Sequence, residues 1–280
     1  MMTTKKYTVP TVLSIAGFDG SGGAGIQADT KTISALGCYA MNVLTALPVQ
    51  NTQGVRHIYE IPTQAVRDQL DAIFDDIYPD AIKIGMVHSL ELVELISSFL
   101  KDYTGEIVFD PVMVSTSGHK LIHDDTIQAC IDLLFPRVSL ITPNLDEVSV
   151  LAKRPIDTIQ EMEKAGFDLL NQDCQAVLIK GGHLQSKELT SLLFQQKQGV
   201  VAFTSPKIDT KNTHGSGCSL SSAIASQLAQ QYPLDQAVAV ALDYVHEAIK
   251  GSKDLIIGKG NGPLNHFHHP YKLIQHEMDQ

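Results

Sequence analysis

A glycine-rich turn directly precedes a cysteine in the stretch NTHGSGCSLSSAIA (212–225). The small residues after Cys218 are typical of a closely packed helix, so Gly215 and Gly217 stand at a helix start. Free backbone NH groups and the helix dipole stabilise negative charge there. No Gly-Lys-Ser/Thr sequence follows, so the turn is not a Walker motif. We therefore expect it to stabilise a phosphoryl group during its transfer.

The helix dipole also lowers the pKa of a thiol placed at this position. Cys218 is then a candidate base, or a hydrogen-bond partner, for a hydroxyl that attacks the phosphoryl group. A small buried residue that only packs at the helix start is the alternative interpretation, since free cysteines are often buried. The spacing alone leaves both interpretations open.

A second glycine-rich loop, GFDGSGGAG (17–25), lies between an apolar run and a helical pattern. Its glycines match the dinucleotide fingerprint GxGxxG, which also needs an acidic residue about 20 positions later. No Asp or Glu occurs between Asp29 and Glu60, so a nicotinamide or flavin site is not expected. A flexible turn remains an alternative. We favour a loop that lets a small substrate lie close to the main chain, with the Asp29 carboxylate pointing at an amino group.

Four further polar residues stand where chemistry is expected. Asp110 follows an apolar run and precedes a proline, as a metal-directed carboxylate does at the end of a strand, although a turn-capping role is possible. Glu147 opens a helical pattern, where the dipole alone favours a carboxylate. Lys180 ends an apolar run before two glycines. The Gln50 amide offers both a donor and an acceptor to a heterocycle.

The elements that position these residues are predicted from periodicity. Apolar runs without polar alternation are typical of strands covered on both faces, and they occur at 11–18, 42–49, 80–87, 106–113, 139–144 and 176–182. Helical patterns alternate with them, at 24–36, 62–77, 89–102, 123–134, 145–153, 158–172, 215–231 and 234–250. This order predicts an α/β fold with a mostly parallel sheet wrapped by helices. Residues 188–204 resemble a hairpin and predict a small antiparallel edge.

Composition narrows the class of protein. The 280 residues are 44% hydrophobic, enough for a large core, and no linker divides them, so 1–280 is predicted to be one domain. No apolar run is long enough for a membrane span or a signal peptide. The four cysteines are widely spaced, which favours a reducing, cytoplasmic location over a structural zinc. A net charge of −10 argues against nucleic acid as a partner.

In these motifs, taken together, the chain resembles the hydroxymethylpyrimidine/phosphomethylpyrimidine kinases of thiamine biosynthesis, in the ribokinase-like superfamily. The resemblance spans nearly the whole chain in order and rests on eight stretches: 16–37, 44–55, KIGMV (83–87), 110–118, 140–151, 177–183, 210–225 and GKGNGPLNHFH (258–268). It implies a three-layer α/β/α fold. It also implies two successive ATP-dependent steps, from the alcohol to the monophosphate and then to the diphosphate.

The resemblance also implies roles for individual residues. The residues that would hold the pyrimidine are Gly17, Asp29, Gln50, Met86 and Val112. Those that would contact ATP are Asn144, Lys180, Thr213, Gly215 and Gly217, and the last two would act in catalysis with Lys180 and Cys218. Asp110 and Glu147 would lie around a magnesium ion (Mg2+). A homodimer is implied as well, although no interface can be read from one chain.

Two rival functions are weighed against this one. A pyridoxal/pyridoxine kinase of vitamin B6 salvage would also act on a small aromatic ring with a hydroxymethyl group, but Gln50 and Met86 favour an aminopyrimidine. A non-catalytic nucleotide- or phosphate-binding sensor on a kinase-like scaffold would not need a base beside an anion site. The complete set of Asp110, Lys180 and Cys218, together with Glu147, therefore favours an enzyme.

Overall fold

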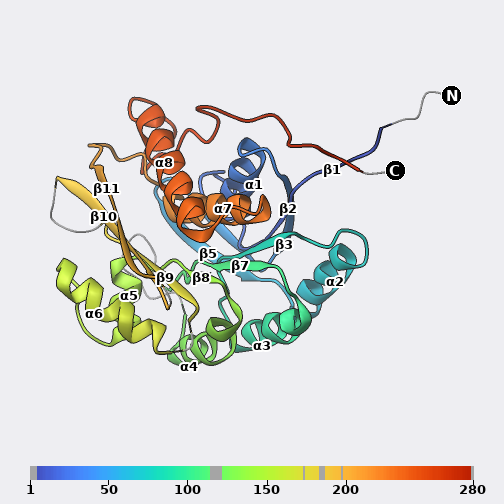
Figure 1. Ribbon diagram of the computed structural model, residues 1–280, viewed down its shortest axis with the longest axis horizontal. Helices are drawn as coiled ribbons and strands as arrows, with labels where there is room; N and C mark the ends of the chain where they lie inside the picture. The colour runs from blue at the N-terminus through green and yellow to red at the C-terminus, as the bar shows by residue number, and fades with distance from the viewer. Residues whose placement is uncertain (1–4, 114–121, 173, 183–186, 197, 279–280) are drawn as a thin grey trace.

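A central eight-stranded sheet forms the middle of the molecule in the computed structural model, which describes residues 5–113, 122–172, 174–182, 187–196 and 198–278 (Figure 1). The strand order is β11-β10-β9-β8-β7-β6-β2-β3. Six strands are parallel: β2 (Thr11–Ala16), β3 (Tyr39–Leu44), β6 (Ala81–Ile84), β7 (Glu106–Phe109), β8 (Leu140–Ile141) and β9 (Ala176–Lys180). At one edge, β10 (Glu188–Gln195) and β11 (Gly199–Pro206) run antiparallel, which confirms the hairpin expected there.

Helices cover both faces of this sheet (Figure 1). One face carries α1 (Gly25–Ala35), α7 (Ser216–Ala229) and α8 (Leu234–Ser252), and the other carries α2 (Thr63–Phe74), α3 (Leu90–Phe99), α4 (Asp124–Ala129), α5 (Leu145–Ala152) and α6 (Ile159–Leu170). Strand β2 contributes to both cores, because Leu13 and Ile15 pack in the larger core and Val12 in the smaller one. The architecture is the expected three-layer α/β/α arrangement with a mostly parallel sheet.

Local sequence signals explain where several elements begin. Helix α5 starts with a capping box, in which Asn144 and Glu147 satisfy each other's backbone NH groups, and α6 starts with another formed by Thr158 and Glu161. Helix α7 is buried from Ser219 to its end, and its serines and alanines allow close approach to α1 and α8. The predicted helices at 89–102 and 123–134 are shorter as α-helices, since each continues as a 3₁₀ or π turn.

One predicted strand is wrong. The apolar run 42–49 does not form a single strand, because β3 ends at Leu44 and β4 (Ala46–Asn51) belongs to a separate sheet with β5 (Gly54–Glu60). Thr45 makes the break: its NH donates to Ala16 O and its hydroxyl to Met86 O, which turns the chain at the edge of the central sheet. We call the β4–β5 sheet the flap. Its second strand is largely exposed and lacks the apolar pattern used for prediction.

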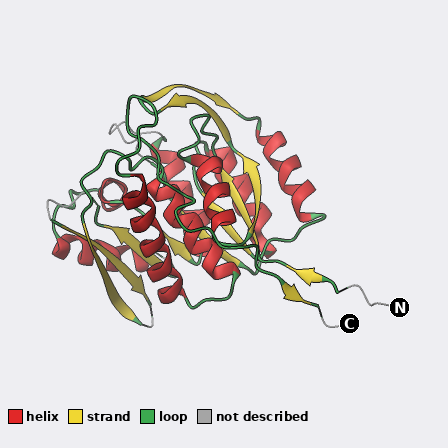
Figure 2. Ribbon diagram, turned by 90° about the horizontal axis from the view of Figure 1, so that it is seen from above, coloured by secondary structure: helices red, strands yellow, loops and turns green. Residues whose placement is uncertain are grey.

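The two ends of the described chain lie together. Strands β1 (Tyr7–Thr8) and β12 (His276–Glu277) pair in a short antiparallel ribbon that extends from the body (Figure 2). Among the described residues, no helix combines the length and the apolar character that a membrane crossing requires.

Candidate functional site

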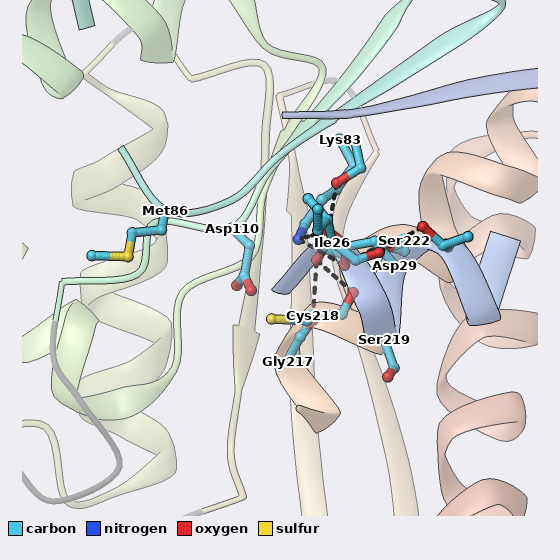
Figure 3. Close-up of polar contacts among 12 residues, drawn as sticks. Ile26, Asp29, Lys83, Met86, Asp110, Gly217, Cys218, Ser219 and Ser222 are labelled. Carbon is cyan, nitrogen blue, oxygen red and sulfur yellow. Dashed lines mark hydrogen bonds and ion pairs between the residues drawn. The ribbon is translucent and has the colours of Figure 1, made fainter. Parts of the chain in front are cut away.

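The carboxyl ends of the parallel strands bring several predicted residues to one edge of the sheet. Gly17 follows β2, Met86 follows β6, Asp110 and Val112 follow β7, and Lys180 ends β9. Gly17 and Met86 are neighbours, because a Cβ at Gly17 would lie 3.5 Å from the Met86 sulfur. Asp110 lies between Met86 and the start of α7 (Figure 3). The strand order therefore collects these side chains as the sequence predicted.

The glycine turn before α7 faces this edge. Gly215 is the N-cap of α7 in a left-handed conformation (φ 82°), and a Cβ there would overlap the backbone oxygen of Gly23. A Cβ at Gly217 would lie 3.3 Å from Lys180 Nζ and 3.4 Å from Asp110 Oδ2. Thr213 closes the turn by accepting a hydrogen bond from Ser216 N. Glycine is therefore needed at this loop, and the first turn of α7 lies close to Lys180 and Asp110.

Lys180 and Asp110 form an ion pair beneath this turn. Lys180 Nζ lies 2.8 Å from Asp110 Oδ1, which also accepts a hydrogen bond from Thr142 Oγ1. Burial alone would raise the pKa of Asp110, but Lys180 and then Lys83 outweigh it and hold this pKa below its usual value. Burial likewise opposes the charge on Lys180, whose pKa is nevertheless raised by Asp110 and Glu147. Both groups are charged at neutral pH, and Asp110 Oδ2 is the oxygen on the side of the turn.

Glu147 and Asn144 reach the same edge from the start of α5. Asn144 N donates to Glu147 Oε2 at 2.7 Å, and Glu147 N donates to Asn144 Oδ1 at 2.9 Å. Burial raises the pKa of Glu147 to about 7, with Lys180 lowering it and Asp110 raising it further. The capping role weighed at the sequence level is therefore present. Glu147 caps α5 and also lies close enough to Asp110 and Lys180 for their charges to shift its pKa.

The pKa expected for Cys218 is wrong. The helix dipole was expected to lower it, but burial raises the pKa of this thiol to about 11. Lys83 lowers this pKa, whereas Asp29 and Asp110 raise it. Burial, together with Asp29 and Asp110, outweighs the effect of Lys83, so Cys218 is a neutral thiol at pH 7. Of the two roles left open by the sequence, this environment favours a hydrogen-bond partner over a preformed thiolate base.

The orientation expected for Asp29 is also wrong. Its carboxylate does not point at an open substrate site, because Asp29 and Lys83 are both fully buried and form an ion pair with an N···O distance of 2.7 Å. Ser14 donates its hydroxyl to Asp29 Oδ2. Ser222 donates its hydroxyl to Asp29 Oδ1 (Figure 3). Asp29 therefore joins β2, α1, β6 and α7 beneath the site and has no exposed surface to offer a ligand.

Gln50 lies on the flap, at a register irregularity between Val49 and Gln50 in the β4–β5 pairing. Such bulges redirect side chains and are frequent beside binding sites. Phe18 N donates to Ala46 O, so the base of the flap is joined to the first glycine loop.

Val112 lies in the turn after β7, where its NH donates to Asp110 O. Residues 114–118 and 183 of the motifs lie outside the described residues.

Sequence reasoning missed Lys83, Asp19 and His214. Lys83 is a charged residue within the apolar run 80–87, an exception that could have been noticed. Asp19 is fully buried and accepts hydrogen bonds from Ser21, Gly23 and Ala24, while His214 Nε2 lies 2.9 Å from its Oδ2. Burial opposes the charge of Asp19, but these hydrogen bonds outweigh it and hold its pKa well below the usual range. The Asp19–His214 contact joins the two glycine loops.

The fold and this site define a ribokinase-like small-molecule kinase. The chain matches the phosphomethylpyrimidine kinase family model over residues 19–265. It is 44% identical over 261 residues to the hydroxymethylpyrimidine/phosphomethylpyrimidine kinase of Rhizobium meliloti, covering 93% of this chain and 98% of that protein. It is also 44% identical to a bifunctional thiamine-biosynthesis protein of Geobacter sulfurreducens, covering 91% of this chain and 52% of that longer protein. The chain therefore belongs to the phosphomethylpyrimidine kinase family.

A solved structure supports the fold. The ADP complex of Bacillus subtilis pyridoxal kinase aligns with a TM-score of 0.86 and 32% identity, over 92% of this chain and 98% of that one. The comparisons confirm the predicted family, fold class and kinase activity, together with the place of that activity in thiamine biosynthesis. Use of ATP by this chain agrees with the ADP in that relative.

Proposed function

We propose that this chain transfers the γ-phosphoryl group of ATP first to the hydroxyl of 4-amino-5-hydroxymethyl-2-methylpyrimidine and then to the resulting monophosphate. The observation that carries this proposal is the approach of the Gly217 backbone to both Lys180 Nζ and Asp110 Oδ2. Phosphoryl transfer depends on in-line positioning and on neutralised oxygens more than on covalent chemistry. The helix start, the partly buried Lys180 and the Asp110 carboxylate beside it supply this positioning and charge.

In the first step, the hydroxymethyl oxygen bonds to the γ-phosphorus while the bond between that phosphorus and the bridging oxygen of ADP breaks. The backbone NH groups of Gly215, Gly217 and Cys218 stabilise the equatorial oxygens, and Lys180 adds positive charge. The Cys218 thiol orients the hydroxyl through a hydrogen bond, because its pKa of about 11 keeps it neutral. The hydroxyl passes its proton to water as the new bond forms, and ADP leaves with the bridging oxygen. In the second step, an ionised phosphate oxygen attacks and needs no base.

Recognition of the pyrimidine is assigned to Gly17, Gln50, Met86 and Val112. The proximity of Gly17 to the Met86 sulfur and the bulge at Gln50 support this assignment. Thr213 and Asn144, which shape the start of α7 and of α5, are assigned to the ATP side of the site.

Asp110 and Glu147 fit a magnesium ion. Magnesium is commonly held by one or two carboxylates with waters and substrate phosphates completing its shell, so a ready-made protein cage is not required. Among the described residues, no group of three or more His, Cys, Asp or Glu side chains forms such a cage. Asp110 keeps Oδ2 on the side of the glycine turn, and Glu147, with a pKa near 7, ionises readily beside a cation. When bound, the ion neutralises charge on the phosphates.

Pyridoxal phosphorylation is a second candidate activity. It is favoured by the high structural similarity to the Bacillus subtilis pyridoxal kinase. The flap amide of Gln50, which can both donate to and accept from an aminopyrimidine, supports the pyrimidine as the preferred substrate.

The remaining proposals concern the whole chain. Residues 1–280 act as one domain, in the cytoplasm, as a homodimer. The four cysteines, all within the described residues, form no disulfide, which supports a reducing compartment. Exposed apolar side chains on the flap support an interface between two copies, namely Leu47, Val49, Val55 and Tyr59.

The proposed function is tested by measuring ADP release from purified protein with magnesium-ATP and, in parallel, hydroxymethylpyrimidine, its monophosphate or pyridoxal. Turnover of both pyrimidines, with a weaker pyridoxal signal, is the expected result. Turnover of pyridoxal alone would move the assignment to vitamin B6 salvage. No turnover with any of the three would refute the proposed substrates.

A further inference from the structure

The C-terminal glycine motif has no part in the chemistry described above, yet it contacts the flap. We call residues 258–263 (GKGNGP) the strap. At one end, Gly260 N donates to Thr52 Oγ1 at 3.1 Å, and Asn261 N donates to Thr52 O at 2.9 Å. A Cβ at Gly260 would overlap the Thr52 carbonyl oxygen, and a Cβ at Gly258 would overlap its hydroxyl. Glycine is therefore required where the strap crosses the flap tip, two residues beyond Gln50.

The other end of the strap contacts the turn that precedes α7. His214 N donates to Gly262 O at 3.1 Å, and His214 and Pro263 form a parallel β-bridge. A Cβ at Gly262 would overlap the Asn212 side-chain oxygen. Asn212 is itself anchored, because its amide nitrogen donates to the carbonyl oxygens of Ser252 and Leu255 at 2.6 and 2.9 Å. This end of the strap is thus fixed to both the glycine turn and the end of α8.

The residue that receives the strap also holds the first glycine loop. The His214 ring lies 2.9 Å from the buried Asp19 carboxylate, and it occupies the space that a Cβ at Gly23 would need. Three walls of the site therefore meet through His214 and the strap: the flap with Gln50, the turn with Cys218, and the loop after β2.

We propose that the strap is a positioning element that fixes the flap relative to the phosphoryl-transfer turn, with Thr52 and His214 as its positioning residues. It sets the separation between Gln50, which recognises the pyrimidine, and the turn before α7, which stabilises the transferred phosphoryl group. Because the flap is otherwise a two-stranded sheet with a largely exposed second strand, this attachment decides how firmly Gln50 is held. The inference rests on the proposed role of Gln50 in binding the ring.

The test uses Thr52→Ala, with Thr52→Ser as the conservative rescue and Gln53→Ala, an exposed neighbour in the same turn, as the matched control. Loss of one hydrogen bond predicts a roughly five-fold higher KM for hydroxymethylpyrimidine and for its monophosphate. The kcat values of both steps and the KM for ATP stay near wild type. Thr52→Ser restores the wild-type KM, and Gln53→Ala leaves it unchanged. Gly260→Ala gives a larger loss in the same direction, because its Cβ separates the strap from Thr52.

A second readout does not depend on the substrate. Hydrogen exchange in the absence of ligand is expected to be faster in Thr52→Ala not only in the flap (46–60) but also at the His214 amide, which bonds to the strap. Faster exchange confined to the flap, or a KM unchanged in both Thr52→Ala and Gly260→Ala, would overturn the proposal. If exchange responds at both places while wild type phosphorylates no pyrimidine, the strap stands as a mechanical link and only the proposed substrate fails.

Discussion

The environment of Cys218 favours a hydrogen-bonding thiol over a preformed thiolate. Burial raises its pKa to about 11, although Lys83 and a hydrogen bond from the Gly25 backbone act in the opposite direction. The surface of Cys218 is partly exposed, whereas the other three cysteines are buried in the two cores and react more slowly with an alkylating reagent. The alkylation rate of Cys218 therefore reports on the balance between burial and these opposing effects.

We expect slow alkylation of Cys218 by iodoacetamide at pH 7, with a rate that rises continuously up to about pH 11. The measurement is the alkylation rate by mass spectrometry across this range, with Cys218→Ser as the blank. A rate that is already at its plateau at pH 7 would show a low-pKa thiolate and would contradict this environment.

Glu147 makes a second residue-scale prediction. Its pKa is raised from 4.5 to about 7 in the folded chain, chiefly by burial. The unfolded state therefore ionises first, and the stability contributed by Glu147 is lost as pH rises from about 4.5 through 7. Without magnesium, Glu147→Gln is expected to remove this loss, which amounts to at most about 3 kcal/mol.

Urea unfolding at pH 5 and pH 8 checks the Glu147 prediction. Glutamine keeps an oxygen that can accept from Asn144 N, so the cap of α5 is preserved. The variant is expected to lose less stability than wild type between the two pH values. An identical pH dependence in both proteins would show that Glu147 ionises normally.

The sequence predicts which residues meet at the site, but not the partners or the burial of each one. Asp110, Lys180 and Gly217 converge as expected, because strand ends and helix starts meet at one edge of a parallel sheet. The partner of Asp29 could not be predicted, since Asp29 lies in α1 and Lys83 on β6, and only the folded molecule brings the ammonium group to the carboxylate. The sign of the Cys218 pKa shift depends on burial, which spacing does not reveal.

At the scale of elements, the flap is the part of the fold that apolar periodicity does not predict. The run 42–49 is mostly apolar, yet Thr45 divides it between two sheets by bonding to Ala16 O and Met86 O. Ala16 ends β2 and Met86 follows β6, and periodicity cannot place these two segments beside Thr45. Apart from β3, the parallel strands and the helices between them were predictable, because each carries its own apolar pattern and length. The flap strand β5 was not, because it is largely exposed and its apolar residues are interspersed with Arg56, His57 and Glu60.

The start of α7 supplies an element-scale prediction. Gly217→Ala places a Cβ 3.3 Å from Lys180 Nζ and 3.4 Å from Asp110 Oδ2, so this ion pair must shift away from the turn. We expect kcat to fall by roughly ten-fold or more in both phosphorylation steps, as when one oxyanion contact is weakened. The free energy of unfolding changes by less than about 1 kcal/mol, because alanine is favoured in a helix.

Gly251→Ala is the matched control for that variant. It lies near the end of α8, and its new Cβ would meet its nearest neighbours at 3.4 Å, an ordinary contact. Steady-state kinetics and thermal unfolding of the two variants are compared with wild type. Equal activity in wild type, Gly217→Ala and Gly251→Ala would show that Gly217 does not contribute to phosphoryl transfer.

At the scale of the whole molecule, the flap exposes apolar side chains that an isolated chain leaves in water. Val49 is 43% exposed and Tyr59 is 57% exposed. We expect light scattering to give a mass near twice the 30.5 kDa of one chain. Replacing both residues by Asp is expected to give a monomer that keeps its fold. A monomeric wild-type protein would contradict the proposed homodimer.

The most direct test of the proposed mechanism separates the two phosphorylation steps in Cys218→Ala, which removes the hydrogen bond of the thiol. Because the thiol orients the hydroxyl only in the first step, we expect kcat/KM for hydroxymethylpyrimidine to fall by roughly ten-fold. The value for the monophosphate, whose attacking oxygen is already ionised, is expected to change by less than about three-fold. Lys180→Met is the comparison, since it weakens both steps. Equal losses in the two steps of Cys218→Ala would contradict the orienting role assigned to Cys218.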